Sequence, residues 1–262
     1  MKEPLFTTSP RQGVLRITMN RPEVHNAFDD LQVVRLIHTL TKAAEDPDIR
    51  VVVLASEGKS FSAGGDIDYM RRMGSNSYQE NIDDGGQLAK LMYTLNFLPK
   101  PTIARIQGAA MGGGVGLACC CDFAVGSPSA LFATSEVKLG MVAATISPYV
   151  VSTVGEKAAR RMFMSALPVR AEQALNLGLL SDLVAESELD AAIDTLSDTL
   201  LQNAPGAVSR SKQLAFDVSS QPFSQDMISA TVKLIADVRD SEEGREGLGA
   251  FLEKRPPNWI KT

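Results

Sequence analysis

The sequence predicts an α/β protein built from repeated strand–strand–helix units, with a helical region at its C-terminus. Two observations support this prediction. Short apolar segments with strand patterns alternate with segments of helical spacing through most of the chain. From about residue 204 to Thr262 the apolar spacing is helical only. We therefore expect a core over residues 1–200 and a helical appendage over residues 201–262.

The first unit is predicted from two strand patterns with a helix between them. Residues 14–20, "VLRITMN", alternate apolar and polar side chains, and residues 49–56, "IRVVVLAS", form the nearly continuous apolar run of a buried strand. Between these strands, apolar residues recur near helical spacing at Leu31, Val34, Leu36, Ile37 and Leu40.

A second unit follows the same order further along the chain. Residues 101–107 have a strand pattern, and residues 112–122 combine a glycine turn with a helix of small residues. Residues 123–127 and 130–135 are then expected to form short strands. Residues 71–90 are polar, which favours a surface loop or a loosely held helix over core.

Composition narrows the possible functions. The 262 residues are 44% hydrophobic and 22% charged with a net charge of −5, which is ordinary for a globular protein and unfavourable for nucleic acid. No apolar run approaches the roughly 20 residues of a membrane span, and the start lacks a signal-peptide pattern, so we expect a cytoplasmic protein. The adjacent Cys119, Cys120 and Cys121, with only His25 and His38, predict neither disulfides nor a metal site.

Two glycine clusters follow predicted strands, "FSAGGDI" at 61–67 and "AAMGGGVGLACC" at 109–120. Since the second cluster opens a helix, its first N–H groups have no intrahelical acceptor. If Gly65 and Gly113 approach each other, their two N–H groups could converge on one oxygen, as an oxyanion hole requires. Taken alone, either cluster favours the simpler interpretation that glycine allows close packing of helix and strand.

Together with their surroundings these clusters resemble the crotonase, or enoyl-CoA hydratase/isomerase, superfamily. The motifs that carry the resemblance occur in family order and span nearly the whole chain. They are "NRPEVHNAF" (20–28), "SFSAGGDI" (60–67), "IQGAAMGGGVGLACCCDFAV" (106–125), "FATSEVKLG" (132–140) and "FLEKRPP" (251–257).

The resemblance implies a ββα spiral core whose C-terminal helices build homotrimers or dimers of trimers. It also implies an acyl-CoA thioester substrate whose thioester oxygen is held by the N–H groups of Gly65 and Gly113. CoA enters as part of the substrate, and no separate cofactor or metal is expected. The further residues that it places around CoA are Val24, Ala63, Asp66 and Ile67 along the channel, and Phe251 and Lys254 at the nucleotide end.

Hydratases of this family typically use two glutamates around a water. The second one corresponds to Glu136, which we expect to be the catalytic acid and base in a partly desolvated site. The first one corresponds to Gly116, one helical turn after Gly113, so this chain departs from the pattern. We expect Gly116 to leave room there for a larger acyl tail.

The motifs around Gly116 and Glu136 look most like bacterial hydratases of 3-branched glutaconyl-CoA thioesters, such as 3-methylglutaconyl-CoA or isohexenylglutaconyl-CoA. These substrates of leucine and acyclic terpene breakdown end in a carboxylate, for which Arg71, Arg72 and Lys138 are candidate partners. An alternative is an enoyl-CoA isomerase in which Glu136 is the sole proton shuttle. Two further alternatives are an RNA-binding protein, which the acidic charge disfavours, and a scaffold without catalytic activity.

Overall fold

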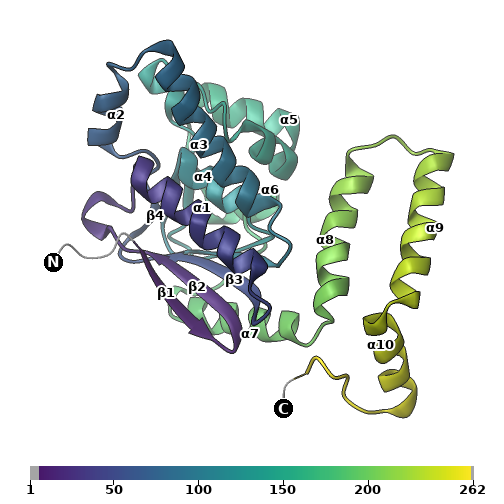
Figure 1. The fold of residues 1–262 in the computed structure, drawn as a ribbon. Coiled ribbons are helices and arrows are strands. Elements are labelled where there is room, and N and C mark those ends of the chain that lie inside the picture. The colour runs from purple at the N-terminus through teal and green to yellow at the C-terminus, as the bar shows by residue number, and fades with distance from the viewer. Residues whose placement is uncertain (1–5, 261–262) are drawn as a thin grey trace.

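Two β-sheets form the centre of the core in the computed structural model, which describes residues 6–260 (Figure 1). The larger sheet has the order β1-β2-β3-β5-β7-β10, with β1 antiparallel to β2 and every other pair parallel. Its strands are β1 (Phe6–Arg11), β2 (Gly13–Met19), β3 (Ile49–Ser56), β5 (Thr102–Ile106), β7 (Phe123–Gly126) and β10 (Asp182–Leu183).

The smaller sheet has the order β4-β6-β8-β9. Its strands are β4 (Ser60–Ser62), β6 (Ala109–Met111), β8 (Leu131–Ala133) and β9 (Val169–Arg170). Successive strands alternate between the sheets, because β3, β5 and β7 belong to the larger sheet and β4, β6 and β8 follow them in the smaller one. Helices come after each such pair, so the predicted α/β fold of ββα units is confirmed.

Seven α-helices belong to the described core. They are α1 (Asp30–Glu45), α2 (Ile67–Met73), α3 (Tyr78–Asn96), α4 (Gly113–Cys120), α5 (Ser147–Ser165), α6 (Ala171–Leu177) and α7 (Leu189–Leu201), with short 3₁₀ turns η1 (Pro22–Val24), η2 (Glu136–Leu139) and η3 (Glu186–Glu188). Helix α1 is capped by Asp29, whose carboxylate accepts the N–H of Gln32, and the helix buries Leu36 and Leu40.

Of the two expectations for the polar segment 71–90, a surface loop or a loosely held helix, the structure shows a helix over most of it. Most of the segment belongs to α3, whose N-cap residue Ser77 forms a complete capping box with Glu80. The C-terminal part of α3 buries Leu91, Met92 and Leu95. Capping and burial at opposite ends therefore hold a helix whose middle is polar.

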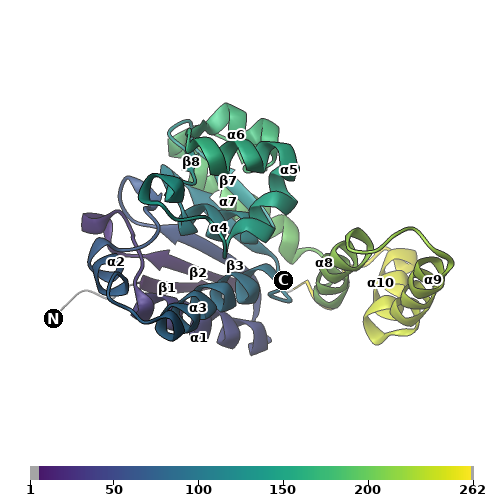
Figure 2. The same cartoon turned by 90° about the horizontal axis from the view of Figure 1, so that it is seen from above.

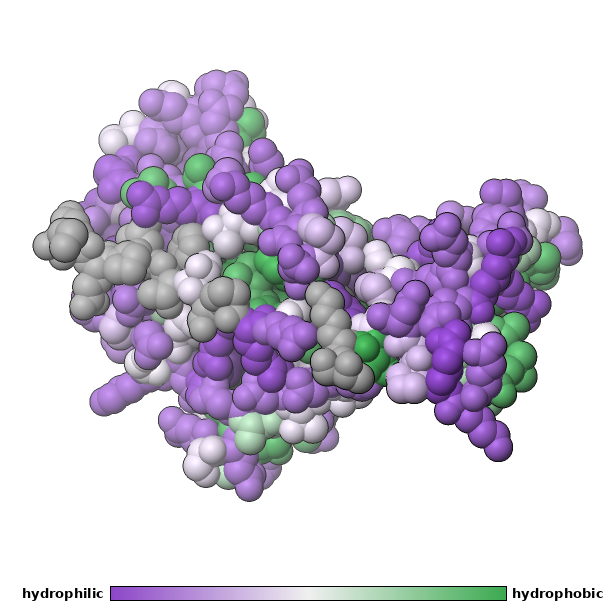
Figure 3. Space-filling view, turned by 60° about the horizontal axis from the view of Figure 1, so that its bottom comes forward, coloured by the Kyte–Doolittle hydropathy of each residue, from purple (hydrophilic) through white to green (hydrophobic). Residues whose placement is uncertain are grey.

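The C-terminal helices α8 (Pro205–Ser219), α9 (Gln225–Asp240) and α10 (Glu242–Glu253) stand to one side of the core (Figures 1 and 2). The ring of Phe216 on α8 packs against Phe97 of the core with centroids 4.8 Å apart. Neither α8 nor α9 buries a residue, and apolar side chains interrupt the polar surface of this appendage (Figure 3). In the described part of the chain, no helix combines the length and apolar character that crossing a membrane requires.

Candidate active site

Two glycine turns lie side by side because the strands that precede them are neighbours. β4 leads into Gly64 and Gly65, and its parallel neighbour β6 leads into Gly112 and Gly113. A Cβ on Gly64 would lie 2.8 Å from the carbonyl oxygen of Met111 and 3.4 Å from the backbone nitrogen of Gly113. Since Gly64 also has φ of +82°, only glycine fits this approach of the two backbones.

Gly65 and Gly113 both present N–H groups without a partner. The N–H of Phe28 donates to Gly64 and the carbonyl of Phe28 accepts from Asp66, so the N–H of Gly65 between them points away from this bridge. Gly113 is the first residue of α4 and has no intrahelical acceptor. Within residues 6–260 neither N–H donates a hydrogen bond, so both are free to bind a ligand oxygen.

Phe28 is a site residue that the sequence analysis missed. Its backbone orients Gly65, and its buried ring lies directly below the second turn, where a Cβ on Gly113 would come within 2.3 Å of the ring carbon Cζ. The residue is part of the motif "NRPEVHNAF", but only the folded chain relates it to both glycines.

Glu136 comes from the third strand of the same edge, because β8 is the parallel neighbour of β6 and ends just before η2. Its Oε1 lies 3.1 Å from the position that a Cβ on Gly112 would take. Its Oε2 is buried without a hydrogen-bond partner among the described residues. Burial raises the pKa of the Glu136 carboxyl, against a smaller opposing effect of its own backbone N–H. The carboxyl group is thus set up to exchange protons.

A cavity of about 260 Å³ opens at these strand ends. The sequence-predicted residues Ala63, Gly65, Gly113 and Glu136 all line it. Most of its remaining wall is apolar, with Val33, Met70, Met73, Leu88, Leu139, Met141, Val142 and Ile146 among the lining residues. The site therefore offers two N–H donors and one carboxyl group at one end of an apolar pocket.

Gly116 does not leave the expected space. A Cβ at Gly116 would lie 2.3 Å from Cγ2 of Ile146 and 3.0 Å from the sulfur of Met92. The residue is buried inside α4 and is absent from the cavity lining. The prediction that it enlarges the acyl pocket is contradicted, because an isoleucine and a methionine already fill this volume.

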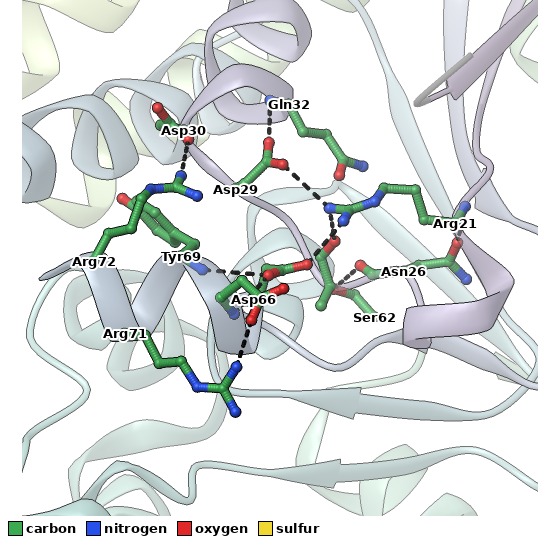
Figure 4. A network of polar contacts seen from close by, with 12 residues as sticks. Arg21, Asn26, Asp29, Asp30, Gln32, Ser62, Asp66, Tyr69, Arg71 and Arg72 are labelled. Atoms are coloured by element: carbon green, nitrogen blue, oxygen red, sulfur yellow. Dashed lines mark hydrogen bonds and ion pairs between the residues drawn. The ribbon is translucent and has the colours of Figure 1, made fainter. Parts of the chain in front are cut away.

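The carboxylate of Asp66 does not face the cavity. It pairs with Arg21 at 2.8 Å and caps α2 by accepting the N–H groups of Asp68 and Tyr69 (Figure 4). Desolvation acts to raise the pKa of Asp66, but the two N–H groups and Arg21 outweigh it and hold the pKa below its ordinary value. The side chain of Asp66 thus fixes the start of α2.

The other predicted CoA-contacting residues lie outside the cavity lining. Val24 is half-buried at the end of η1, and Ile67 is 66% exposed at the start of α2. Phe251 is 79% exposed on α10, and Lys254 caps that helix at φ of +55°. Their roles toward CoA stay predictions. Metal-binding clusters of His, Cys, Asp and Glu are absent from the described residues.

Alternating ββα units that carry two free N–H groups and one carboxyl group to one sheet edge define a protein of the crotonase class. The family model described as enoyl-CoA hydratase/isomerase matches residues 9–262, and the chain belongs to this family of enzymes. The predicted superfamily and the prediction of an enzyme of hydratase type are therefore confirmed.

Relatives cover nearly the whole chain. The chain is 31% identical to the 2,3-dehydroadipyl-CoA hydratase of Escherichia coli over 96% of each protein. An enoyl-CoA hydratase from Shewanella pealeana has a solved structure that is 38% identical, with a TM-score of 0.95 over 98% of this chain and 97% of that one. A crotonase-type structure from Legionella pneumophila is 44% identical, with a TM-score of 0.93 over 98% and 99% of the two chains.

Proposed function

We propose that this protein adds water across the double bond of an α,β-unsaturated acyl-CoA thioester. The observation that carries the proposal is the convergence of Gly65, Gly113 and Glu136 from three neighbouring strands onto one cavity. Donors without partners next to a desolvated carboxyl group suit a reaction that builds negative charge on one oxygen and moves one proton.

The reaction follows from this arrangement. A water molecule gives a proton to the Glu136 carboxylate while its oxygen bonds to C3, and the electrons of the C2=C3 bond move onto the thioester. The resulting enolate oxygen accepts hydrogen bonds from Gly65 and Gly113, which stabilise it more than the uncharged ground state. Protonated Glu136 then returns its proton to C2, which restores both the carboxylate and the thioester.

Isomerisation is the second candidate, because Gly116 supplies no carboxylate and Ile146 fills the space beside it. In that reaction, starting from a 3-enoyl thioester, Glu136 would take a proton from C2 and return it to C4 through a dienolate held by the same two N–H groups. Both reactions use the same charge stabilisation and differ only in whether water attacks C3.

Of the finer substrate prediction, a 3-branched glutaconyl-CoA, only the branch stays a prediction, because the inference drawn below argues against the distal carboxylate. The apolar cavity wall suits a branch at C3. The distal carboxylate of such a substrate is considered separately below, because it requires a cationic partner.

For assembly, we infer that residues 201–262 form an oligomerisation region that builds a trimer or a dimer of trimers. Support comes from large apolar side chains that the isolated chain leaves exposed on α9 and α10, including Val232 at 61%, Leu248 at 62% and Leu252 at 70%. Light scattering coupled to size-exclusion chromatography tests this inference, and a stable monomer at micromolar concentration would refute it.

Liquid chromatography with mass spectrometry tests the reaction. The protein is incubated with crotonyl-CoA, 3-hexenoyl-CoA, 3-methylglutaconyl-CoA and isohexenylglutaconyl-CoA. Hydration predicts a mass gain of one water that is lost in Glu136→Gln and kept in the control Glu156→Gln, whose side chain is 78% exposed. Conversion of 3-hexenoyl-CoA to its 2-enoyl isomer without any hydration would establish the isomerase instead, and no conversion of any thioester would refute both.

A further inference from the structure

The charged side chains that line the cavity are of one sign only. Besides the glycine turns, the lining includes Tyr69, Met70 and Met73 of α2, Asp84, Gln87 and Leu88 of α3, and Leu139 with residues 141–146. The charged residues of the lining are Asp30, Asp84 and Glu136. No Lys, Arg or His contributes to this lining within the described chain.

Asp84 has no cationic partner among the described residues. Its carboxylate accepts the hydroxyl hydrogen of Tyr69, and it forms no ion pair within residues 6–260. Burial, and then the hydrogen bond to Asp84, raise the pKa of Tyr69, so the phenol remains a neutral donor. A half-buried carboxylate therefore faces the cavity with its charge uncompensated.

The nearby arginines are already paired with other carboxylates. Arg72 lies 2.8 Å from Asp30 and Arg71 lies 2.7 Å from Asp68, and the guanidinium of Arg72 is 5.6 Å from the centre of the Tyr69 ring (Figure 4). Lys138 is exposed on η2 and does not line the cavity. A carboxylate at the end of an acyl chain would have to share Arg72 with Asp30 to find a cation here, and Arg72 is not part of the lining.

Resting on the proposed acyl-CoA site, we propose that the cavity selects a neutral, apolar acyl group and that Asp84 is the residue that rejects acyl groups ending in a carboxylate. A methyl terminus gains from contact with Met70, Met73 and the apolar segment 139–146. A carboxylate terminus would lose its water without gaining a cation and would meet the like charge of Asp84.

This selectivity would separate the chain from one of its own relatives. The E. coli protein is named for 2,3-dehydroadipyl-CoA, a thioester that ends in a carboxylate. A neutral six-carbon counterpart differs from it only by a methyl group in place of that carboxylate. The two six-carbon acyl groups are therefore a matched pair for a test.

The test is isothermal titration of the assembled, full-length protein with hexanoyl-CoA and adipyl-CoA. Both are saturated and cannot be hydrated, so their affinities are independent of turnover. We expect hexanoyl-CoA to bind at least about tenfold more tightly, since an unpaired carboxylate in a partly dry pocket is strongly disfavoured. Equal affinity, or tighter binding of adipyl-CoA, would overturn the proposal.

Two variants separate the charge of Asp84 from its contact with Tyr69. Asp84→Asn keeps an acceptor for the phenol and removes the charge. It should therefore reduce the affinity ratio, defined as the affinity for hexanoyl-CoA divided by that for adipyl-CoA, at least about threefold. Tyr69→Phe removes the hydrogen bond and keeps the charge, so it should preserve the ratio. An unchanged ratio in Asp84→Asn would remove Asp84 from the proposal, and weaker adipyl-CoA binding in Arg72→Gln would identify Arg72 as a carboxylate anchor and overturn it.

A measurement on the unaltered protein covers the case in which a variant fails to fold. The preference for hexanoyl-CoA over adipyl-CoA should decrease as salt rises from about 0.05 to 0.5 M, because salt screens the repulsion between Asp84 and the adipyl carboxylate. A salt-independent ratio would contradict the role of that charge. If 2-hexenoyl-CoA is hydrated but adipyl-CoA binds as well as hexanoyl-CoA, the selectivity fails while the reaction stands. If hexanoyl-CoA is selected but no enoyl thioester is hydrated, the reaction fails instead.

Discussion

The ring of Phe28 occupies the space that a side chain on Gly113 would need, since Cζ lies 2.3 Å from the position of a Cβ there. The backbone of the same phenylalanine forms a parallel bridge with Gly65, and this bridge directs the N–H of Gly65 away from Phe28. One buried residue therefore positions both donors of the proposed oxyanion hole. This contact explains why the residue at position 113 must be glycine.

Gly113→Ala should lower kcat by roughly 10²–10³, the typical cost of losing one oxyanion-hole donor, because the new methyl group displaces the turn from Phe28. Steady-state kinetics with a 2-enoyl-CoA measures the loss, and circular dichroism checks the fold. Adding Phe28→Leu should restore part of the rate by making room for the methyl group. Unaltered kcat in a folded Gly113→Ala protein would contradict the assignment of Gly113 as a donor.

Glu136 should set the acid limb of the pH–rate profile. Because burial raises the pKa of this carboxyl group, kcat/KM should fall on acidification at a pH clearly above 4.5, the ordinary value for Glu. The profile is measured with one enoyl-CoA across pH 4 to 9. An acid limb at the ordinary value would mean that Glu136 is not the group whose ionisation controls the rate.

The raised pKa of Glu136 also makes the free energy of unfolding depend on pH, in the direction opposite to that of an acid in a salt bridge. Between the unfolded and folded pKa values the native state binds more protons, so the free energy of unfolding falls as pH rises through this interval. Glu136→Gln removes this dependence. Urea unfolding across that interval should therefore show a smaller loss of stability on raising the pH in the variant than in the unaltered protein.

Much of the core fold could be predicted because its strands leave a pattern in the sequence. β3, β5, β7 and β8 fall within predicted strand segments, β2 begins one residue before its predicted segment, and α1 and α4 fall within predicted helices. β4 and β6 were not predicted, because each is only three residues long and runs directly into a glycine turn. For the polar segment 71–90 the sequence did not decide between a loop and a helix, since helix α3 depends on a capping box at one end and on apolar residues near its other end.

Within the site, the residues predicted from motifs at strand ends are those that line the cavity together, namely Gly65, Gly113 and Glu136. What the sequence could not show depends on tertiary packing. Three contacts join segments that are far apart in the chain and leave no periodic pattern. They are the contact of the Phe28 ring with Gly113, that of Ile146 with Gly116, and the ion pair of Asp66 with Arg21.

Gly116→Glu should destabilise the protein and should not improve hydration. The new Cβ alone would overlap Ile146, and overpacking of a filled core typically costs 1–3 kcal/mol or more. Thermal unfolding should show the loss in the single variant. The double variant with Ile146→Ala makes room for the carboxylate and tests separately whether a second acid accelerates water addition. A stable single variant with faster hydration would contradict the packing argument.

The carboxylate of Asp66 should contribute to stability rather than to chemistry. Asp66→Ala removes the cap of α2 and the partner of Arg21, so we expect the free energy of unfolding at pH 7 to fall by about 1–2 kcal/mol. Asp68→Ala is the matched control, because it breaks an ion pair with Arg71 in which both side chains are at least 77% exposed. That control should change stability by less than about 0.5 kcal/mol.

The pH dependence of this difference follows from the lowered pKa of Asp66. A carboxyl group with a depressed folded-state pKa stabilises the protein above its unfolded value of roughly 3.9, and this contribution is lost as pH falls through the lower folded value. Urea unfolding of the Asp66→Ala and unaltered proteins should therefore differ less at pH 3 than at pH 7. A difference that persists unchanged at pH 3 would show that the charge of Asp66 is not what holds α2 in place beside the cavity.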